Sequence, residues 1–279
     1  MYTEQRSART LRRSLSAWYA RSGRDLPWRR TRDPYAILVA EVMLQQTPVA
    51  RVLPAYEAFL RRFPTLRSLA RAPLADVLRL WSGLGYNRRA RDLQRVARAC
   101  GDGLPVDSAA LVALPGIGAY TAGAVACFAA GERTPFADTN IRRVLGRIVL
   151  GRTATEREAV AIDRELLPRD PRSWHHALMD LGATVCVARA PRCDACPVAA
   201  LCRSRGRAGA PEPRRQAAFA TSTRRLRGLA MRRLVAAPGG LSRARLERAL
   251  ADARAASVID ALARDGLIQI ASGRVRLPA

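Results

Sequence analysis

Apolar residues recur at helical spacing, every three or four positions, through roughly the first 200 residues, and no stretch there alternates as a half-buried strand does. Pro64, Pro73 and the glycine-rich stretch 83–86 divide this pattern into segments. The expected helices lie within residues 1–30, 35–47, 54–63, 74–81, 88–100 and 140–149, with a further pair on either side of Pro115. The sequence therefore predicts a mainly α fold.

The segment 35–47 is apolar almost all round, which is typical of a buried helix. Asp33 and Pro34 precede it as N-cap and first helical residue. Glu41 is its only charged residue, and Gln45 follows one turn later on the same face. Burial disfavours an ionised carboxylate, so we expect a raised pKa for Glu41, as a general acid requires. A structural role, in which Glu41 pairs with an arginine or caps a helix, explains the residue equally well.

Gly116 and Gly118 bracket the turn between the two helices around Pro115. Asp107 or Ser108 can cap the first helix, and the glycines leave free amides at the start of the second, where phosphate binds. A tight turn between packed helices is the simpler explanation. However, Asp138 follows Gly118 after 20 residues. A phosphate-binding turn followed by a carboxylate indicates an enzyme that holds a nucleic-acid backbone and acts on one nucleotide.

The composition also indicates a polyanionic partner. The chain of 279 residues has a net charge of +25 and 49% hydrophobic residues, so it is a folded, strongly basic protein, although an arginine-rich genome also raises basic content. All 48 basic residues are arginine, so no side-chain amine can form a Schiff base. No stretch approaches the ~20 apolar residues of a membrane span, and we expect a cytoplasmic protein that does not enter membranes.

Four cysteines within 17 residues form the pattern Cys186-x6-Cys193-x2-Cys196-x5-Cys202. In a reducing compartment, clustered cysteines are more often metal ligands than disulfides. Zinc and an iron–sulfur cluster both remain possible on spacing alone. Arg189 and Arg192 lie inside this loop, which we therefore expect to touch phosphate. All four ligand positions come from the protein, which favours a structural site.

The tail combines helices with two short strands. Expected helices at residues 221–235, 243–251 (capped by Ser242) and 255–264 precede strands at 267–271 and 274–277, an arrangement that resembles a small winged-helix module. From residue 213 onward the chain has 14 arginines against four acidic residues, which suits DNA phosphate. We expect this module to add duplex affinity and to help inspect the strand opposite the target base. The alternative is a packing appendage with solvated arginines.

The turn LPGIGAYTAGA, Asp138, the helix EVMLQQT and the four-cysteine loop occur together and in order over roughly residues 10–205. In this combination the chain resembles the helix–hairpin–helix DNA glycosylases, and among them the adenine-specific group. The resemblance implies two helical lobes and a [4Fe–4S] cluster on Cys186, Cys193, Cys196 and Cys202. It also implies a double-stranded DNA partner that contains adenine opposite 8-oxoguanine or guanine. We expect the protein to act as a monomer.

Residue roles follow from the same resemblance. Glu41 matches the general acid that protonates adenine N7, and Asp138 matches the carboxylate that stabilises the sugar cation. Asn140 matches a polar supporter of that carboxylate. Tyr120 stands where lyase-type relatives carry lysine, so the expected enzyme is monofunctional. The implied DNA contacts are Gln45, Gln46, Tyr86, Gly116, Gly118, Arg189 and Arg192, with Tyr86 near the oxidised guanine.

The expected domains are a cluster lobe of residues 1–30 and 137–205, a helical lobe of residues 31–136, a linker at 206–220 and the winged-helix-like module at 221–279. That module is too short for the β-rich domain with which many members read 8-oxoguanine. A lyase-type glycosylase is disfavoured by the missing lysine. A monofunctional glycosylase for another mispaired base, such as thymine in T:G, is harder to exclude. A non-enzymatic DNA-binding regulator is the remaining alternative.

Overall fold

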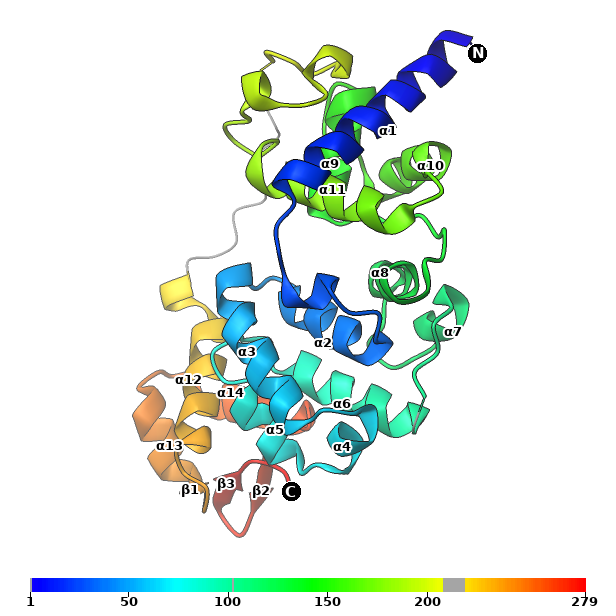
Figure 1. Cartoon of the computed structure of the whole chain (residues 1–279). Helices are drawn as coiled ribbons and strands as arrows, with labels where there is room; N and C mark the ends of the chain where they lie inside the picture. The colour runs from blue at the N-terminus through cyan, green and yellow to red at the C-terminus, as the bar shows by residue number, and fades with distance from the viewer. Residues whose placement is uncertain (1, 102, 208–218) are drawn as a thin grey trace. The chain divides into compact units, whose positions relative to one another are not determined.

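A computed structural model describes residues 2–101, 103–207 and 219–279 of the chain, with side chains from residue 7 onward (Figure 1). The described residues are mainly helical, as predicted, and they cluster into two compact units. Among these residues, unit 1 comprises 2–37, 106–113 and 117–207, and unit 2 comprises 38–101, 103–105, 114–116 and 219–279. No helix among the described residues is both long and apolar enough to cross a membrane.

Unit 1 is built around α11, which packs against α1 and α9, while α9 also packs on α10 and α7 on α8. Leu178 and Leu181 of α11 and Ile141, Val144 and Leu145 of α9 are fully buried. Short 3-10 turns, Cys193–Ala195 and Ala199–Leu201, shape the loop after α11. The helices are α1 Tyr2–Ser22, α7 Ser108–Val112, α8 Ala119–Ala130, α9 Thr139–Val149, α10 Glu156–Leu166 and α11 Pro171–Thr184.

Unit 2 contains a helical layer and the C-terminal module. Phe59, Phe63 and Trp81 form an edge-to-face aromatic core, with ring centroids 5.1 and 6.0 Å apart. Helix α2 starts in unit 1 and continues into unit 2. The helices of this layer are α2 Pro34–Leu44, α3 Val49–Arg62, α4 Leu66–Arg71, α5 Leu74–Leu80 and α6 Arg88–Cys100.

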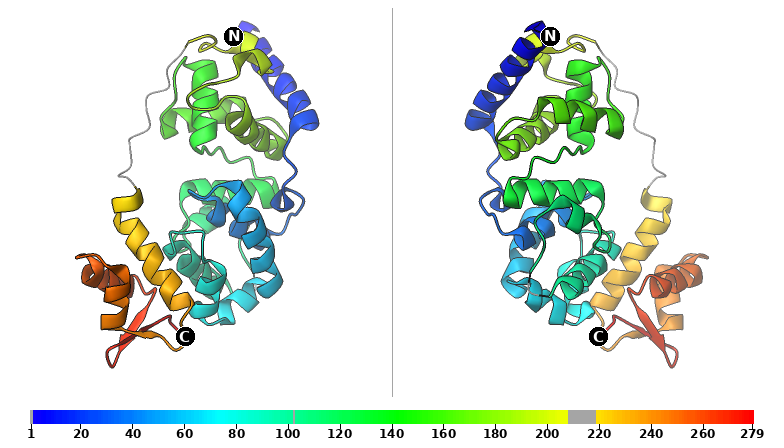
Figure 2. Two further views of the ribbon diagram at one scale, coloured as in Figure 1. Left: turned by 90° about the vertical axis from the view of Figure 1, so that its left-hand side faces the viewer. Right: turned by 90° about the vertical axis from the view of Figure 1, so that its right-hand side faces the viewer.

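The C-terminal module has the helices and strands of a winged helix. Its helices are α12 Thr223–Val235, α13 Arg243–Leu250 and α14 Ala255–Arg264, and its strands are β1 Leu241–Ser242, β2 Gln269–Ala271 and β3 Arg274–Arg276. The strands are antiparallel in the order β1-β3-β2, with Val275 between Leu241 and Ile270. Figure 2 shows these orange and red elements gathered around α12. The expected linker at 206–220 lies mostly outside the described residues.

Three local expectations differ from the structure. The helix expected at 35–47 ends at Leu44, because Gln46 adopts a left-handed conformation with φ 56°. The helix expected from Pro54 begins at Val49, so that Pro54 lies inside α3. Strand β1 was too short to show as a pattern in the sequence. The units also divide the chain differently from the expected lobes, because α7 and α8 cluster with unit 1.

Candidate active site and cluster loop

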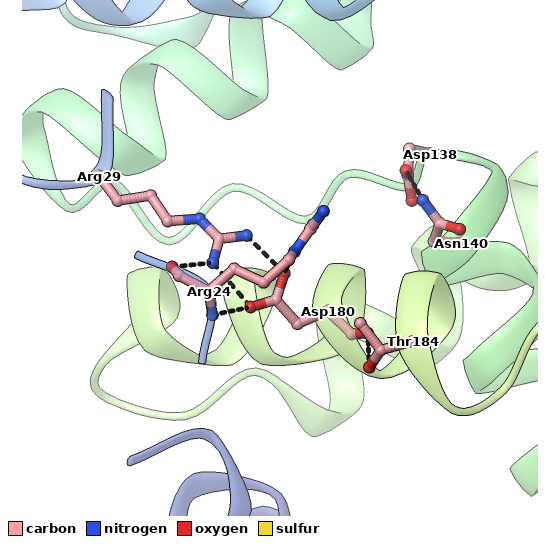
Figure 3. A network of polar contacts seen from close by, with 6 residues as sticks. All are labelled: Arg24, Arg29, Asp138, Asn140, Asp180 and Thr184. Atoms are coloured by element: carbon pink, nitrogen blue, oxygen red, sulfur yellow. Dashed lines mark hydrogen bonds and ion pairs between the residues drawn. The ribbon is translucent and has the colours of Figure 1, made fainter. Parts of the chain in front are cut away.

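Asp138 is the N-cap of α9 and is held by its own helix. Its Oδ1 accepts a hydrogen bond from the Ile141 amide at 2.7 Å, and its Oδ2 accepts one from Asn140 Nδ2 at 2.8 Å (Figure 3). An N-cap carboxylate is stabilised by the free amides and by the positive end of the helix dipole. The side chain is thereby fixed in one orientation, as a catalytic anion requires.

Arg143 extends this arrangement to the cysteine loop. Its Nη2 donates to Asn140 Oδ1 at 2.7 Å and to the Gly182 carbonyl at 2.6 Å, while its Nε donates to the Cys186 carbonyl at 2.7 Å. Helices α9 and α11 come so close here that a Cβ on Gly182 would lie 2.6 Å from Asn140 Cβ. A continuous chain of hydrogen bonds therefore joins Asp138 to the backbone of the first clustered cysteine.

The ionisation of Asp138 reflects two opposed effects. Burial raises its pKa above the ordinary value, because it removes water from the charged form. The amide of Ile141, the donors of Asn140 and the charge of Arg143 act in the opposite direction. Asp138 is therefore a carboxylate whose charge depends on its hydrogen-bond donors.

A fully buried carboxylate supports the segment that leads to Asp138. Asp163 of α10 accepts hydrogen bonds from Trp174 Nε1 at 2.7 Å and from the Phe136 amide at 3.2 Å. It also contacts His175 Nε2 at 2.8 Å, and the imidazole stacks on the Phe136 ring with centroids 3.9 Å apart. Asp163 and His175 are completely buried. This network holds Phe136, two residues before Asp138, through both its backbone amide and its ring.

The N-terminal segment is attached to unit 1 by another buried carboxylate. Asp180 of α11 accepts from Arg29 Nη1 and Nη2, each at 2.7 Å, and from Arg24 Nε at 2.6 Å and the Arg24 amide at 2.9 Å (Figure 3). These hydrogen bonds satisfy both carboxylate oxygens, as a buried charge requires. The segment between α1 and α2 is thus fixed to α11.

Glu41 occupies the other candidate catalytic position, in the unit 2 part of α2. Only 6% of the residue is exposed, and its neighbours Ala40, Val42 and Met43 are buried. Asp33 caps the helix as predicted, through a 2.9 Å hydrogen bond from the Tyr35 amide. Glu41 is therefore a carboxyl group inside an apolar helix, and its raised pKa stays a prediction.

The end of α2 is held by a half-buried arginine of α6. Arg89 Nη1 donates to the carbonyls of Val42, Met43 and Gln45 at 2.7, 3.0 and 2.5 Å. Its Nη2 donates to Thr47 Oγ1 at 3.1 Å and to the carbonyls of Leu84 and Gly85 at 3.3 and 3.0 Å. Burial lowers its pKa to about 10, so the guanidinium remains charged at neutral pH. Arg89 therefore joins the turn that carries Gln45 and Gln46 to the loop that carries Tyr86.

The two glycines in the turn between α7 and α8 have different structural roles. Gly116 has φ 79°, and a Cβ there would lie 2.9 Å from Asp92 Cβ, so only glycine fits without rearrangement. Gly118 is the N-cap of α8 and has nothing within 4 Å of a Cβ position, so a backbone could approach it. Tyr120, half-buried in the first turn of α8, packs edge-to-face on Phe136 at 5.7 Å.

The loop with Cys186, Cys193, Cys196 and Cys202 follows α11 and is shaped by Arg147. Arg147 donates to the carbonyls of Val187 and Ala188 at 2.8 and 2.7 Å and lies 3.4 Å from Cys186 Sγ. Burial raises the pKa of the Cys196 thiol to about 11, and the other three thiols add to the rise. Arg189 and Arg192 are exposed, although Arg192 also donates to the Thr184 carbonyl.

The four cysteines of this loop all lie within the described residues and can supply four thiolates. A [4Fe–4S] cluster is larger than a single metal ion, and four thiolates bind its separate corners. Arg143 and Arg147 also bring positive charge to the loop, which suits thiolate ligands.

The sequence analysis assigned no role to Arg89, Arg143, Arg147, Asp163 or His175. Nothing in a single sequence tells which of 48 basic residues turns inward. For Asp163 and His175 a weak signal existed, since each lies on an otherwise apolar helix face.

Comparison with known families agrees with this geometry. Residues 39–169 match the HhH-GPD superfamily of base excision DNA repair proteins, and residues 186–202 match the iron–sulfur binding domain of endonuclease III. The adenine DNA glycosylase of Mycobacterium tuberculosis is 45% identical over 283 residues, with 95% of this chain and 92% of the relative covered. The human adenine DNA glycosylase is 43% identical, over 70% of this chain and 39% of the human protein.

Solved structures show the same fold. A thermostable thymine-DNA glycosylase superposes with a TM-score of 0.67 at 28% identity, covering 72% of this chain and 97% of that one. A non-covalent endonuclease III–DNA complex superposes with a TM-score of 0.61 at 25% identity, covering 71% and 95%. The chain binds DNA and has an endonuclease III-type iron–sulfur domain, and it belongs to the adenine DNA glycosylases, the base excision repair enzymes that hydrolyse N-glycosyl bonds.

Proposed function

We propose that the enzyme excises adenine mispaired with 8-oxoguanine or guanine, by hydrolysis and without a covalent amine intermediate. The observation that carries this proposal is the presence of two carboxylates in different surroundings. Glu41 is buried in an apolar helix, whereas Asp138 is held by donors at a helix N-terminus. Such a pair suits one acid and one anion, the division of labour in glycoside hydrolysis.

The reaction begins with extrusion of the adenine nucleotide from the duplex, which costs a few kcal/mol of unstacking. Adenine is a poor leaving group, so Glu41 protonates it at N7 as the glycosidic bond breaks. Asp138 stabilises the positive charge that develops on the sugar, and Asn140 keeps the carboxylate aligned. Water then adds to the sugar carbon. Tyr120 has no amine, so the strand stays intact at the abasic site.

The remaining proposed residues bind the duplex. Gln45 and Gln46 form the turn after α2, which can enter the space left by the extruded base. The free backbone amides of the turn at Gly116 and Gly118 bind a phosphate of the DNA backbone. Arg189 and Arg192 add phosphate contacts from the loop whose Cys186, Cys193, Cys196 and Cys202 would hold the [4Fe–4S] cluster. With all four ligands supplied by the protein, the cluster serves to shape this loop.

A single-turnover assay on four duplexes, A:8-oxoG, A:G, T:G and A:T, tests the proposal. We expect excision from the first two, with strands that break only after alkali or heat. Preference for T:G would favour the alternative of a thymine mismatch glycosylase, which the likeness to a thymine-DNA glycosylase supports. Binding without excision of any base would favour a non-enzymatic regulator. Efficient borohydride trapping would contradict the absence of amine chemistry. A monomeric state and a cytoplasmic location stay predictions.

A further inference from the structure

The ring of Phe136 is packed against side chains of α8 and α11. The His175 imidazole stacks on it, with ring centroids 3.9 Å apart and 23° between the planes. Tyr120 and Phe128 of α8 pack on the same ring edge-to-face, at centroid distances of 5.7 and 5.8 Å. The backbone of α8 is also so close that a Cβ on Gly123 would lie 3.1 Å from the Phe136 Cβ. A change at His175 would therefore reach Phe136 and, through it, Tyr120.

Both ring nitrogens of His175 lie beside hydrogen-bond acceptors. Nδ1 is 2.8 Å from the Pro171 carbonyl, which can only accept, so this nitrogen carries a proton and donates. Cys127 Sγ lies 3.4 Å from the same nitrogen. Nε2 is 2.8 Å from Asp163 Oδ2, and this oxygen also accepts from the Phe136 amide at 3.2 Å, as an ionised carboxylate does. His175 is therefore an imidazolium paired with Asp163, and a cation over an aromatic face is attracted to the ring electrons.

Asp138 follows the anchored Phe136 after a single residue. It ends the segment 131–138, which has no regular secondary structure, so the backbone there is held by individual contacts. Phe136 is attached to the ion pair twice, by its amide to Asp163 and by its ring to His175. The N-cap hydrogen bond fixes the Asp138 carboxylate on the α9 side, and Phe136 fixes the chain that enters from the other side. The ion pair can therefore determine where Asp138 stands.

We propose that His175 is a positioning residue for base excision, whose charged ring holds Phe136 and thereby places Asp138 and Tyr120 in the candidate active site. The inference rests on the proposed function and adds a residue that acts on the site from outside it. A displacement of about 1 Å at the reacting groups can lower a rate about a hundredfold. His175 is completely buried, so its replacement should lower the excision rate and leave DNA binding almost unchanged.

Nitrogen NMR tests the charge on His175 directly, because the chain has only two histidines. His176 provides the internal reference, since burial and the nearby charge of Arg29 lower its pKa to about 3 and leave it neutral at pH 7. We expect one imidazole with protons on both nitrogens and one with a single proton. Two neutral rings at pH 7 would overturn the proposal. The measurement needs no DNA, so its outcome is independent of the base that the enzyme excises.

A double-mutant cycle on the single-turnover excision rate tests the action through Phe136. The variants are His175→Gln, Phe136→Leu and the two combined. Glutamine can still donate to Asp163, but it has no ring and no charge. Each single variant should lower the rate about tenfold to a hundredfold, and the double variant no further, because both changes act through one ring. The dissociation constant for the duplex should stay close to that of the wild-type enzyme.

Trp174→Phe is the matched control for the loss of a hydrogen bond to the same carboxylate. Trp174 Nε1 donates at 2.7 Å to Asp163 Oδ1, whereas Phe136 and His175 both bind Oδ2. This variant should lower the unfolding temperature and keep most of the excision rate. Equal losses of rate for Trp174→Phe and His175→Gln, or additive losses in the cycle, would overturn the proposal.

Phe136→Leu leaves the ion pair intact and keeps the test decisive if His175→Gln does not fold. It must lose excision rate without losing duplex affinity, and a normal rate would refute the role of the ring. The rates are measured on the mispair that the wild-type enzyme cleaves. A failure of this inference is therefore distinct from a failure of the proposed function.

Discussion

The two candidate catalytic carboxylates differ in how the protein surrounds them. Asp138 in unit 1 is tied to the helix N-terminus, to Asn140 and, through Arg143, to the loop of the clustered cysteines. Glu41 in unit 2 lies in an apolar helix whose C-terminal end is held by the half-buried Arg89. Donors that point at Asp138 act against the rise in its pKa that burial causes. For Glu41, burial in an apolar helix leads us to expect a raised pKa. The contrast matches the anion and acid roles proposed for them.

Charged residues that are buried or half-buried hold loops in both units. In unit 1, the buried Asp163 and Asp180 accept hydrogen bonds from several donors. In unit 2, the half-buried Arg89 donates to several carbonyls. A single buried group with many partners fixes several segments at once, so each of these residues holds loops that regular secondary structure leaves unsupported.

The strongest test of the contrast removes each carboxylate in turn. Glu41→Gln and Asp138→Asn should each lower the single-turnover excision rate by about a hundredfold or more, since general acid catalysis alone contributes 10²–10⁴. Duplex affinity should stay within about tenfold, because phosphate contacts dominate it. Near-normal excision by either folded variant would remove that residue from the mechanism.

The anionic support in unit 1 is tested by Asp163→Asn. Asparagine keeps one acceptor oxygen, but its NH2 group takes the place of the other carboxylate oxygen, which faces the Phe136 amide and His175 Nε2. Because two donors then face each other in a buried site, we expect unfolding in urea to show a loss of about 3–5 kcal/mol. Asp25→Asn is the control, because the Asp25–Arg30 pair is exposed, with 69% and 68% of the two side chains accessible. The control should cost far less, because an exposed ion pair contributes little to stability. Equal losses would show that Asp163 contributes no more than a surface charge.

The cationic support in unit 2 is tested by Arg89→Lys. An ammonium group cannot reach the carbonyls on both sides of the guanidinium, so we expect a loss of about 2 kcal/mol in unfolding free energy. Duplex binding should also weaken, since the turn with Gln46 and the loop with Tyr86 lose their common support. Arg95→Lys, at a largely exposed position on the same helix, should leave both quantities unchanged. A stable variant with normal affinity would refute the role of Arg89.

The smallest expected effect is a shift in pH dependence. Donation from Asn140 lowers the pKa of Asp138 against the rise caused by burial, so Asn140→Ala should raise it further. Because the ionised form is needed, the acid limb of the single-turnover pH profile should move to higher pH, and activity should recover as the pH increases. The alkaline limb, which reports the general acid Glu41, should stay in place. A loss of rate that is equal at every pH would contradict this.

The sequence by itself determined the helical fold, the cysteine loop, the glycine turn and the order of the candidate catalytic residues. These features depend on local spacing, such as the apolar run around Glu41, the cap at Asp33 and the four closely placed cysteines. The winged-helix-like module was also readable, because Ser242 and Gly273 mark its helix start and hairpin turn.

Only the tertiary structure decided which polar residues turn inward and what they bind. The turn at Gln45 and Gln46 leaves the helix because Arg89, more than 40 residues away, binds the last carbonyls of α2. The pairing of Phe136 with Asp163, of Arg143 with Cys186 and of Tyr86 with Arg224 likewise joins distant segments. Such contacts depend on how helices pack, and the spacing of residues along one helix carries no record of them.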